Sequence, residues 1–120
     1  MKILVTDDSK MARKMLIKTL DEFIKEDHEI FQATNGEECL SIYKKESCDL
    51  VFLDLTMPVM DGFVALKKLK EYNKDVKVII VSADIQKGSL DKVLEDGAIN
   101  FVKKPIDNSK MKQLLEQLSF

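Results

Sequence analysis

Short apolar runs alternate with amphipathic stretches along the whole chain. The apolar runs are rich in β-branched residues and are bounded by turn-forming residues, a pattern that is typical of buried strands. They predict strands at residues 2–6, 29–34, 50–54 and 76–82, with a short fifth strand inside residues 100–105.

The stretches between these strands repeat apolar residues at steps of three and four, which is the helical period. In the first of them Ala12, Leu16 and Leu20 follow this spacing, and Ser9 is a suitable N-cap residue. The pattern predicts helices at residues 9–26, 37–46, 63–72, 85–95 and 108–118. The fourth helix has the weakest pattern, because Gly88 lies in its first turn.

Strand–helix alternation of this kind predicts an α/β fold with a parallel sheet and helices on both faces. In an open sheet of this class, the functional crevice lies at the carboxyl ends of the strands, where the strand order reverses. The 120 residues contain no internal repeat and no linker, so we expect a single domain over residues 1–120.

Polar residues follow four of the five predicted strands. Asp7 and Asp8 follow the first strand, Asp54 and Ser82 end the third and the fourth, and Lys104 follows the fifth. Taken singly, these residues have ordinary interpretations as a solvated turn, a helix-capping acid or a surface lysine. Because the carboxyl ends of parallel strands share one edge of the sheet, we expect their side chains to converge there.

Three carboxylates at one edge need cations beside them. Two unit charges about 4 Å apart repel by about 4 kcal/mol at an effective dielectric of 20. Lys104 supplies one positive charge, and Mg²⁺, which prefers oxygen ligands, fits the remainder. Such a site suits phosphoryl transfer to Asp54, because a carboxylate can form an aspartyl phosphate while a metal and an ammonium neutralise the phosphoryl charge.

Composition excludes several other classes of protein. A net charge of −2 does not suggest the extended basic face that nucleic-acid binding needs, and no apolar run approaches the length of about 18 residues that a membrane span needs. The N-terminus turns acidic too soon for a signal peptide, so we expect a cytoplasmic protein. Cys39 and Cys48 are unsuited to a metal pair, and two free thiols are favoured over a disulfide, which the sequence leaves open.

The residues at the strand ends resemble those of bacterial receiver domains, the phospho-acceptor modules of two-component signalling. The chain is most similar to the single-domain, chemotaxis-type response regulators. The matching segments are TDDS at 6–9, LDLTMPVMDG at 53–62, SA at 82–83 and GAINFVKKP at 97–105. The resemblance spans essentially the whole chain and implies a doubly wound, flavodoxin-like (βα)₅ three-layer sandwich with strand order 2-1-3-4-5.

The resemblance also implies roles for individual residues. Asp54 would be the phosphorylated aspartate, and Lys104 would pair with the phosphoryl group. Asp8 would bind Mg²⁺ directly and Asp7 would assist through water, while Asp54 and the backbone carbonyl of Thr56 would complete the protein ligands. Mn²⁺ is expected to substitute for Mg²⁺.

Three further residues receive roles from the resemblance. The Lys104–Pro105 peptide is expected to be cis, which aims the lysine into the cleft. Ser82, where threonine is also frequent, would bond a phosphoryl oxygen. Phe101 occupies the aromatic switch position, where tyrosine is common, and its alternative is a plain core phenylalanine.

The expected function is a switch that is phosphorylated by a sensor histidine kinase or a histidine phosphotransfer protein. Beyond its own phosphorylation and dephosphorylation we expect no enzymatic activity. Thr56 and Asp84, each two residues beyond a site residue, would tune the phosphoryl lifetime. Phosphorylation would change partner binding on the face of the fourth helix, fifth strand and fifth helix. The downstream target stays unknown, and the chain is expected to be a monomer, with phosphorylation-induced dimerisation left open.

Three rival interpretations are weaker. A haloacid-dehalogenase-type phosphatase needs a second aspartate two residues after the nucleophile, where Thr56 stands. A flavin-binding module needs a hydroxyl-rich loop after the first strand, where Asp7 and Asp8 would repel a phosphate. A receiver that serves only as a phosphorylation-independent scaffold is disfavoured, because all the key residues are present.

Two other features of the sequence are read as surface. His28, the only histidine, precedes the second strand and is expected to be a surface residue and not a phosphoryl donor. Arg13, Lys14 and Lys18 form a basic side of the first helix. We interpret that side as solvated surface, with docking of a kinase as the alternative.

Overall fold

The computed structural model describes residues 1–83 and 86–118, in which strands and helices alternate. The strands are β1 (Lys2–Thr6), β2 (Glu29–Ala33), β3 (Leu50–Leu53), β4 (Val78–Ser82) and β5 (Asn100–Lys103). The helices are α1 (Lys10–Phe23), α2 (Gly36–Glu46), α3 (Gly62–Tyr72), α4 (Lys87–Glu95) and α5 (Asn108–Gln117). None of the helices in these two ranges is both long enough and apolar enough to cross a membrane.

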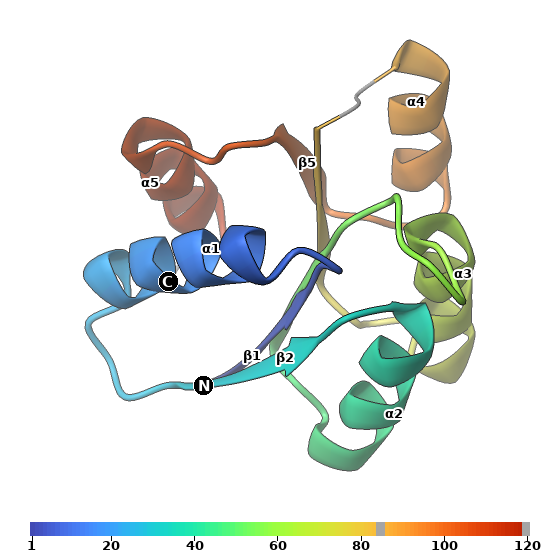
Figure 1. Cartoon of the computed structure of the whole chain (residues 1–120), viewed down its shortest axis with the longest axis horizontal. Coiled ribbons are helices and arrows are strands. Elements are labelled where there is room, and N and C mark those ends of the chain that lie inside the picture. Colours follow the sequence, from blue (N-terminus) through green and yellow to red (C-terminus); the bar gives the residue numbers. More distant parts are fainter. Residues whose placement is uncertain (84–85, 119–120) are drawn as a thin grey trace.

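All five strands are parallel, in the order β2-β1-β3-β4-β5. This confirms the predicted flavodoxin-like α/β fold. Helices α1 and α5 cover one face of the sheet, and α2, α3 and α4 cover the other (Figure 1). The strand order reverses between β1 and β3, so a crevice opens where these two strands end.

The central strands are buried on both faces, which explains their continuous apolar sequences. Along β3, Leu50 and Phe52 pack in the apolar cluster beneath α1 and α5, while Val51 and Leu53 pack in the cluster beneath α2, α3 and α4. This two-residue alternation is that of a strand. Two separate cores therefore clamp β3 and fix the position at which its carboxyl end emerges.

Some predicted boundaries are wrong by a few residues. Helix α1 ends at Phe23 because Ile24 adopts an extended backbone and is only 4% exposed, which takes the chain off the helix toward β2. Strand β2 ends at Ala33, one residue earlier than predicted, and the N–H of the next residue, Thr34, donates to the Glu38 carboxylate at 2.7 Å. Strand β4 begins two residues later than predicted, at position 78, and α4 begins at 87, while residue 85 lies outside the described ranges.

The two cysteines are free and buried, as the sequence favours. Burial raises the pKa of the Cys39 thiol to about 12 and that of Cys48 to about 11. Neither thiol is therefore a nucleophile at neutral pH. The expectation for His28 is only partly right, because its side chain is 13% exposed and its Nε2 lies 2.7 Å from Oδ1 of Asp21.

Candidate functional site

Three of the predicted site residues continue the sheet by one position beyond their strands. Asp7 follows β1, Asp54 follows β3 and Lys104 follows β5. Their backbone N–H groups donate to the last carbonyl of the neighbouring strand, β2, β1 and β4 respectively, at 3.0, 3.0 and 2.9 Å. The hydrogen-bond ladder of the sheet therefore fixes the backbone from which each of these side chains starts.

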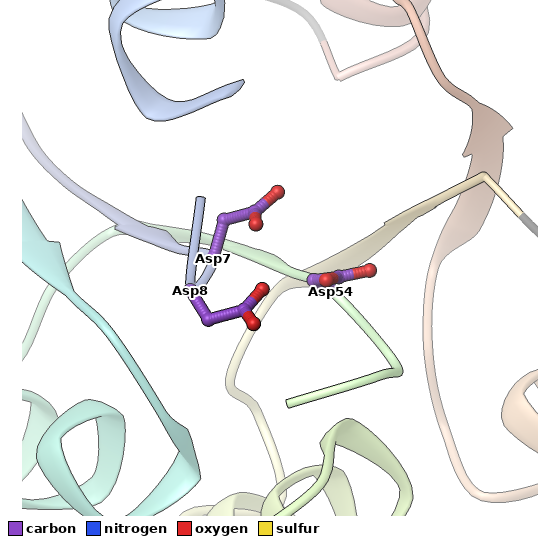
Figure 2. Close-up of side chains that lie close together, drawn as sticks. All are labelled: Asp7, Asp8 and Asp54. Atoms are coloured by element: carbon purple, nitrogen blue, oxygen red, sulfur yellow. The ribbon is translucent and has the colours of Figure 1, made fainter. Parts of the chain in front are cut away.

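The three carboxylates gather at the ends of β1 and β3 (Figure 2). One oxygen from each of Asp7, Asp8 and Asp54 lies within 4.8 Å of the others. Asp7 and Asp54 are buried, at 6% and 5% exposure, while Asp8 is exposed. An all-oxygen donor set of this spread can be bridged by one hard cation and its water ligands, so these residues fit Mg²⁺.

Lys104 brings a positive charge to the two buried carboxylates. Its Nζ lies 2.5 Å from Oδ2 of Asp7 and 3.4 Å from Oδ2 of Asp54. Burial lowers the pKa of Lys104, but the hydrogen bond to Asp7 and the charges of both carboxylates outweigh this effect, and the pKa lies above its ordinary value. The lysine is therefore a permanent cation in this cleft at neutral pH.

Asp54 is held at both carboxylate oxygens. Its Oδ1 accepts the N–H of Leu55 at 2.9 Å, and its Oδ2 faces Lys104. Burial raises the pKa of Asp54, with a further rise from Asp7, and together they exceed the lowering by Lys104 and the Leu55 N–H. The anion is thus incompletely compensated in its cleft, and a further cation would stabilise it.

The loop from β3 to α3 is packed tightly against Asp54. A Cβ at Gly62 would meet the backbone carbonyl oxygen of Asp54 and would lie 2.8 Å from the Cα of Leu55. Only glycine fits there, which agrees with the close packing expected at the start of α3. At the tip of the loop, Val59 is 77% exposed and has a φ of +66°, a conformation that β-branched residues rarely adopt.

The remaining predicted residues other than Asp84 lie on β4, on β5 and in the loops that follow β3 and β5. Ser82 ends β4 and is 2% exposed. Phe101 is half-buried and packs against the cluster beneath α2, α3 and α4. The Lys104–Pro105 peptide is cis, and Thr56 is exposed in the β3–α3 loop. Asp84 lies outside the described residues.

Sequence reasoning missed the contribution of Arg13. Lys14 and Lys18 are exposed, as expected, but Arg13 turns back to the β1–α1 loop. Its Nη1 donates to the backbone carbonyl of Asp7 at 2.6 Å, and its Nε donates to Oε1 of Gln32 at 3.0 Å. A signal was present, because long helical side chains lean toward the N-terminus and Arg13 lies one turn after the N-cap.

Comparison with known proteins gives a consistent result. The response regulator receiver domain family matches residues 3–116. The chemotaxis protein CheY of Bacillus subtilis is 34% identical, over 97% of this chain and 95% of that protein. Sporulation initiation phosphotransferase F of the same organism is 37% identical, over 97% of this chain and 91% of that protein. A chain in the crystal structure of the CheX-CheY-BeF₃-Mg²⁺ complex from Borrelia burgdorferi superposes with a TM-score of 0.90 at 33% identity, over 99% of this chain and 89% of that one.

Proposed function

Because this chain belongs to the response regulator receiver domain family, it is a phosphorylation-dependent signalling switch, and we propose that Asp54 is the residue that receives the phosphoryl group. The observation that carries the proposal is the convergence of Asp54 with Asp7, Asp8 and Lys104 at one edge of the sheet. The phosphatase alternative is not favoured, because Thr56 stands where that mechanism needs its general acid.

The proposed donor is a phosphohistidine on a sensor histidine kinase or a histidine phosphotransfer protein. A carboxylate oxygen of Asp54 attacks the phosphorus, the bond from phosphorus to the imidazole nitrogen breaks, and the nitrogen leaves with the electron pair. Lys104, whose Nζ already lies 3.4 Å from Asp54, neutralises charge on the phosphoryl oxygens. The carboxylates of Asp7 and Asp8 repel the incoming phosphoryl group least when cations compensate their own charges.

Asp7, Asp8, Asp54 and the carbonyl of Thr56 are the proposed ligands of a divalent cation. Mg²⁺ would neutralise the phosphoryl oxygens during transfer, and Mn²⁺, which accepts the same oxygen donors, would substitute for it. The chain itself contributes the geometry, since Asp7 and Asp54 are each fixed by the sheet ladder. Thr56 and Asp84 are proposed to tune the phosphoryl lifetime, and Thr56 is exposed in the loop after β3.

The proposed output is a population shift toward a second conformation. The phosphoryl group adds acceptor oxygens that draw in the hydroxyl of Ser82 and the ammonium of Lys104. Phe101, half-buried at the start of β5, would then move inward and alter the surface of α4, β5 and α5. A downstream protein that binds the two surfaces unequally reads the signal. We infer a single receiver domain over residues 1–120, a monomer before phosphorylation, and a cytoplasmic location.

The test of the acceptor uses acetyl phosphate with Mg²⁺, or a phosphorylated histidine kinase, and detects one added phosphoryl group by intact mass. We expect the wild type and the exposed-acid control Asp75→Asn to be labelled and Asp54→Asn to stay unlabelled. Equal labelling of Asp54→Asn would show that the acceptor is another residue.

The test of the switch adds beryllofluoride and Mg²⁺ to the unphosphorylated protein and follows the backbone amide resonances. We expect shifts at Ser82, Phe101 and Lys104 and at the surface of α4, β5 and α5. If the shifts stay confined to the loops that carry Asp8 and Asp54, no conformational switch reaches that surface.

A further inference from the structure

The two adjacent acids of the β1–α1 loop are held in different ways. Asp7 is fixed at every polar group: its N–H donates to the last carbonyl of β2, its Oδ1 accepts the N–H of Ser9 at 2.9 Å, and its Oδ2 lies 2.5 Å from Lys104 Nζ. Across residues 1–83 and 86–118, we find no hydrogen bond or ion pair to the exposed carboxylate of Asp8. The position of Asp8 therefore depends on its backbone.

The backbone of Asp8 is set by the peptide that joins it to Asp7. The carbonyl of Asp7 and the N–H of Asp8 lie in one rigid plane, so fixing the direction of that carbonyl fixes where Asp8 begins. The carbonyl accepts a charge-assisted hydrogen bond of 2.6 Å from Nη1 of Arg13. The Nε of the same guanidinium is anchored on Gln32 of β2 at 3.0 Å.

We propose that Arg13 is a positioning residue for the site of the divalent cation. By orienting the Asp7–Asp8 peptide, Arg13 holds the exposed Asp8 carboxylate at the mouth of the cleft. The inference rests on the proposed function, because it takes Asp7 and Asp8 as metal ligands. Arg13 itself touches neither the metal nor the phosphoryl group. Residues that orient ligands in this indirect way typically contribute about 10- to 100-fold to metal affinity.

The charge of Arg13 acts in the opposite direction to its geometry. The guanidinium on the Asp7 carbonyl repels a Mg²⁺ bound at the neighbouring carboxylates, so removing it should strengthen metal binding if charge were its only effect. If Arg13 positions Asp8, removing it should weaken binding. Lys14 is a matched control, since it is the next residue on α1 and carries the same charge but is exposed. The sign of the change in affinity therefore separates the two effects.

The experiment titrates Mg²⁺ alone into the full chain and measures its dissociation constant by calorimetry and by amide shifts at the cleft. We expect Arg13→Gln to weaken Mg²⁺ binding about tenfold and Arg13→Lys, which keeps one donor, to weaken it less. Lys14→Gln should leave the affinity unchanged or slightly higher. The gain in urea midpoint on adding Mg²⁺ should shrink in Arg13→Gln, whereas a purely structural role would lower the midpoint equally with and without the metal.

Other outcomes have defined meanings. Mg²⁺ affinity in Arg13→Gln equal to or tighter than the wild type overturns the proposal. If that variant does not fold, Gln32→Ala decides. Gln32 is exposed, and its truncation removes the anchor of the Arg13 guanidinium on β2. Weaker Mg²⁺ binding in Gln32→Ala supports the proposal, and unchanged binding overturns it. Asp8→Asn tests the proposed metal site itself. If Asp8→Asn still binds Mg²⁺ as the wild type does, the proposed metal site is wrong. If Asp8→Asn loses Mg²⁺ binding while Arg13→Gln keeps full affinity, only the proposed role of Arg13 is wrong.

Discussion

Gly62 begins α3 directly against the backbone of the proposed phospho-acceptor, and we predict that Gly62→Ala damages both the fold and the site. The added methyl would lie 2.8 Å from the Cα of Leu55 and 2.9 Å from the carbonyl carbon of Asp54. Ordinary carbon contacts begin near 3.4 Å, so the loop and the end of β3 must separate by at least about 0.6 Å. These neighbours are backbone atoms, which cannot rotate away.

The magnitude follows from two opposing effects. Overpacking of this kind costs about 1–3 kcal/mol, whereas replacing glycine by alanine in a helix recovers about 0.4–1 kcal/mol through the unfolded chain. We therefore expect the free energy of unfolding to fall by about 1–2 kcal/mol. Because a misplacement of about 1 Å can cost 100-fold in rate, we expect phosphorylation of Asp54 by acetyl phosphate to slow by at least about tenfold.

The assay pairs Gly62→Ala with Gly88→Ala. Gly88 also lies in the first turn of a helix, but a Cβ there would meet nothing within 4 Å. Urea unfolding should show Gly88→Ala to be more stable than the wild type by up to about 1 kcal/mol, with an unchanged phosphorylation rate. If Gly62→Ala behaves like Gly88→Ala in both measurements, the close approach of α3 to Asp54 does not position the acceptor.

Three further changes have expected outcomes. Val59→Asn should raise the free energy of unfolding by about 1 kcal/mol in urea, because asparagine tolerates a positive φ and the exposed valine loses no burial; no gain would show that position 59 is unstrained. Hydrogen bonding to the Glu26 carbonyl and to Asp21 raises the pKa of His28 above 6.5, so its stabilising contribution is complete below about pH 6.5 and is lost as pH rises through the folded-state pKa. In Asp21→Asn the part of the free energy of unfolding that depends on the charge of His28 should become smaller. The change should be below about 1 kcal/mol, because the native Asp21 side chain is 57% exposed. An unchanged pH profile of the free energy of unfolding would contradict the pairing of His28 with Asp21. Lys104→Met leaves two buried carboxylates without their cation and should lower the metal-free stability at neutral pH by about 3 kcal/mol; Mg²⁺ should then raise the urea midpoint more than in the wild type, and an equal rise would argue against shared electrostatics.

The sequence predicted the fold well because each local pattern agreed with the global one. The run that ends at Asp54 is apolar throughout since β3 is covered on both faces, and its neighbour β4 reads the same way for the same reason. Parallel strands then bring polar residues from distant parts of the chain to one edge. The gathering of Asp7, Asp54 and Lys104 could therefore be predicted from their positions after strands, without any knowledge of distances.

What the sequence could not predict depends on side-chain direction and on local competition. By its charge and its place on α1, Arg13 resembles the exposed Lys14 and Lys18. Its contact with the Asp7 carbonyl in the β1–α1 loop depends on the direction that its side chain takes. The contact of the Thr34 N–H with the Glu38 carboxylate just after β2 likewise depends on where a side chain points. The positive φ of Val59 has no sequence signal at all, because valine is among the residues least suited to it.

The continuation of the sheet ladder into Asp7, Asp54 and Lys104 has a consequence for how this protein can change over time. These three amides belong to the most cooperative part of the molecule, so their hydrogen exchange should require opening of the sheet itself. The ladder bonds use backbone atoms only, so the sheet holds the starting point of the side chain at each of these positions whatever the residue is. The loop tips around Thr56 and Val59 lie outside the strands. Variation can therefore adjust the timing and the partners of the signal at the rim while the reacting groups stay in place.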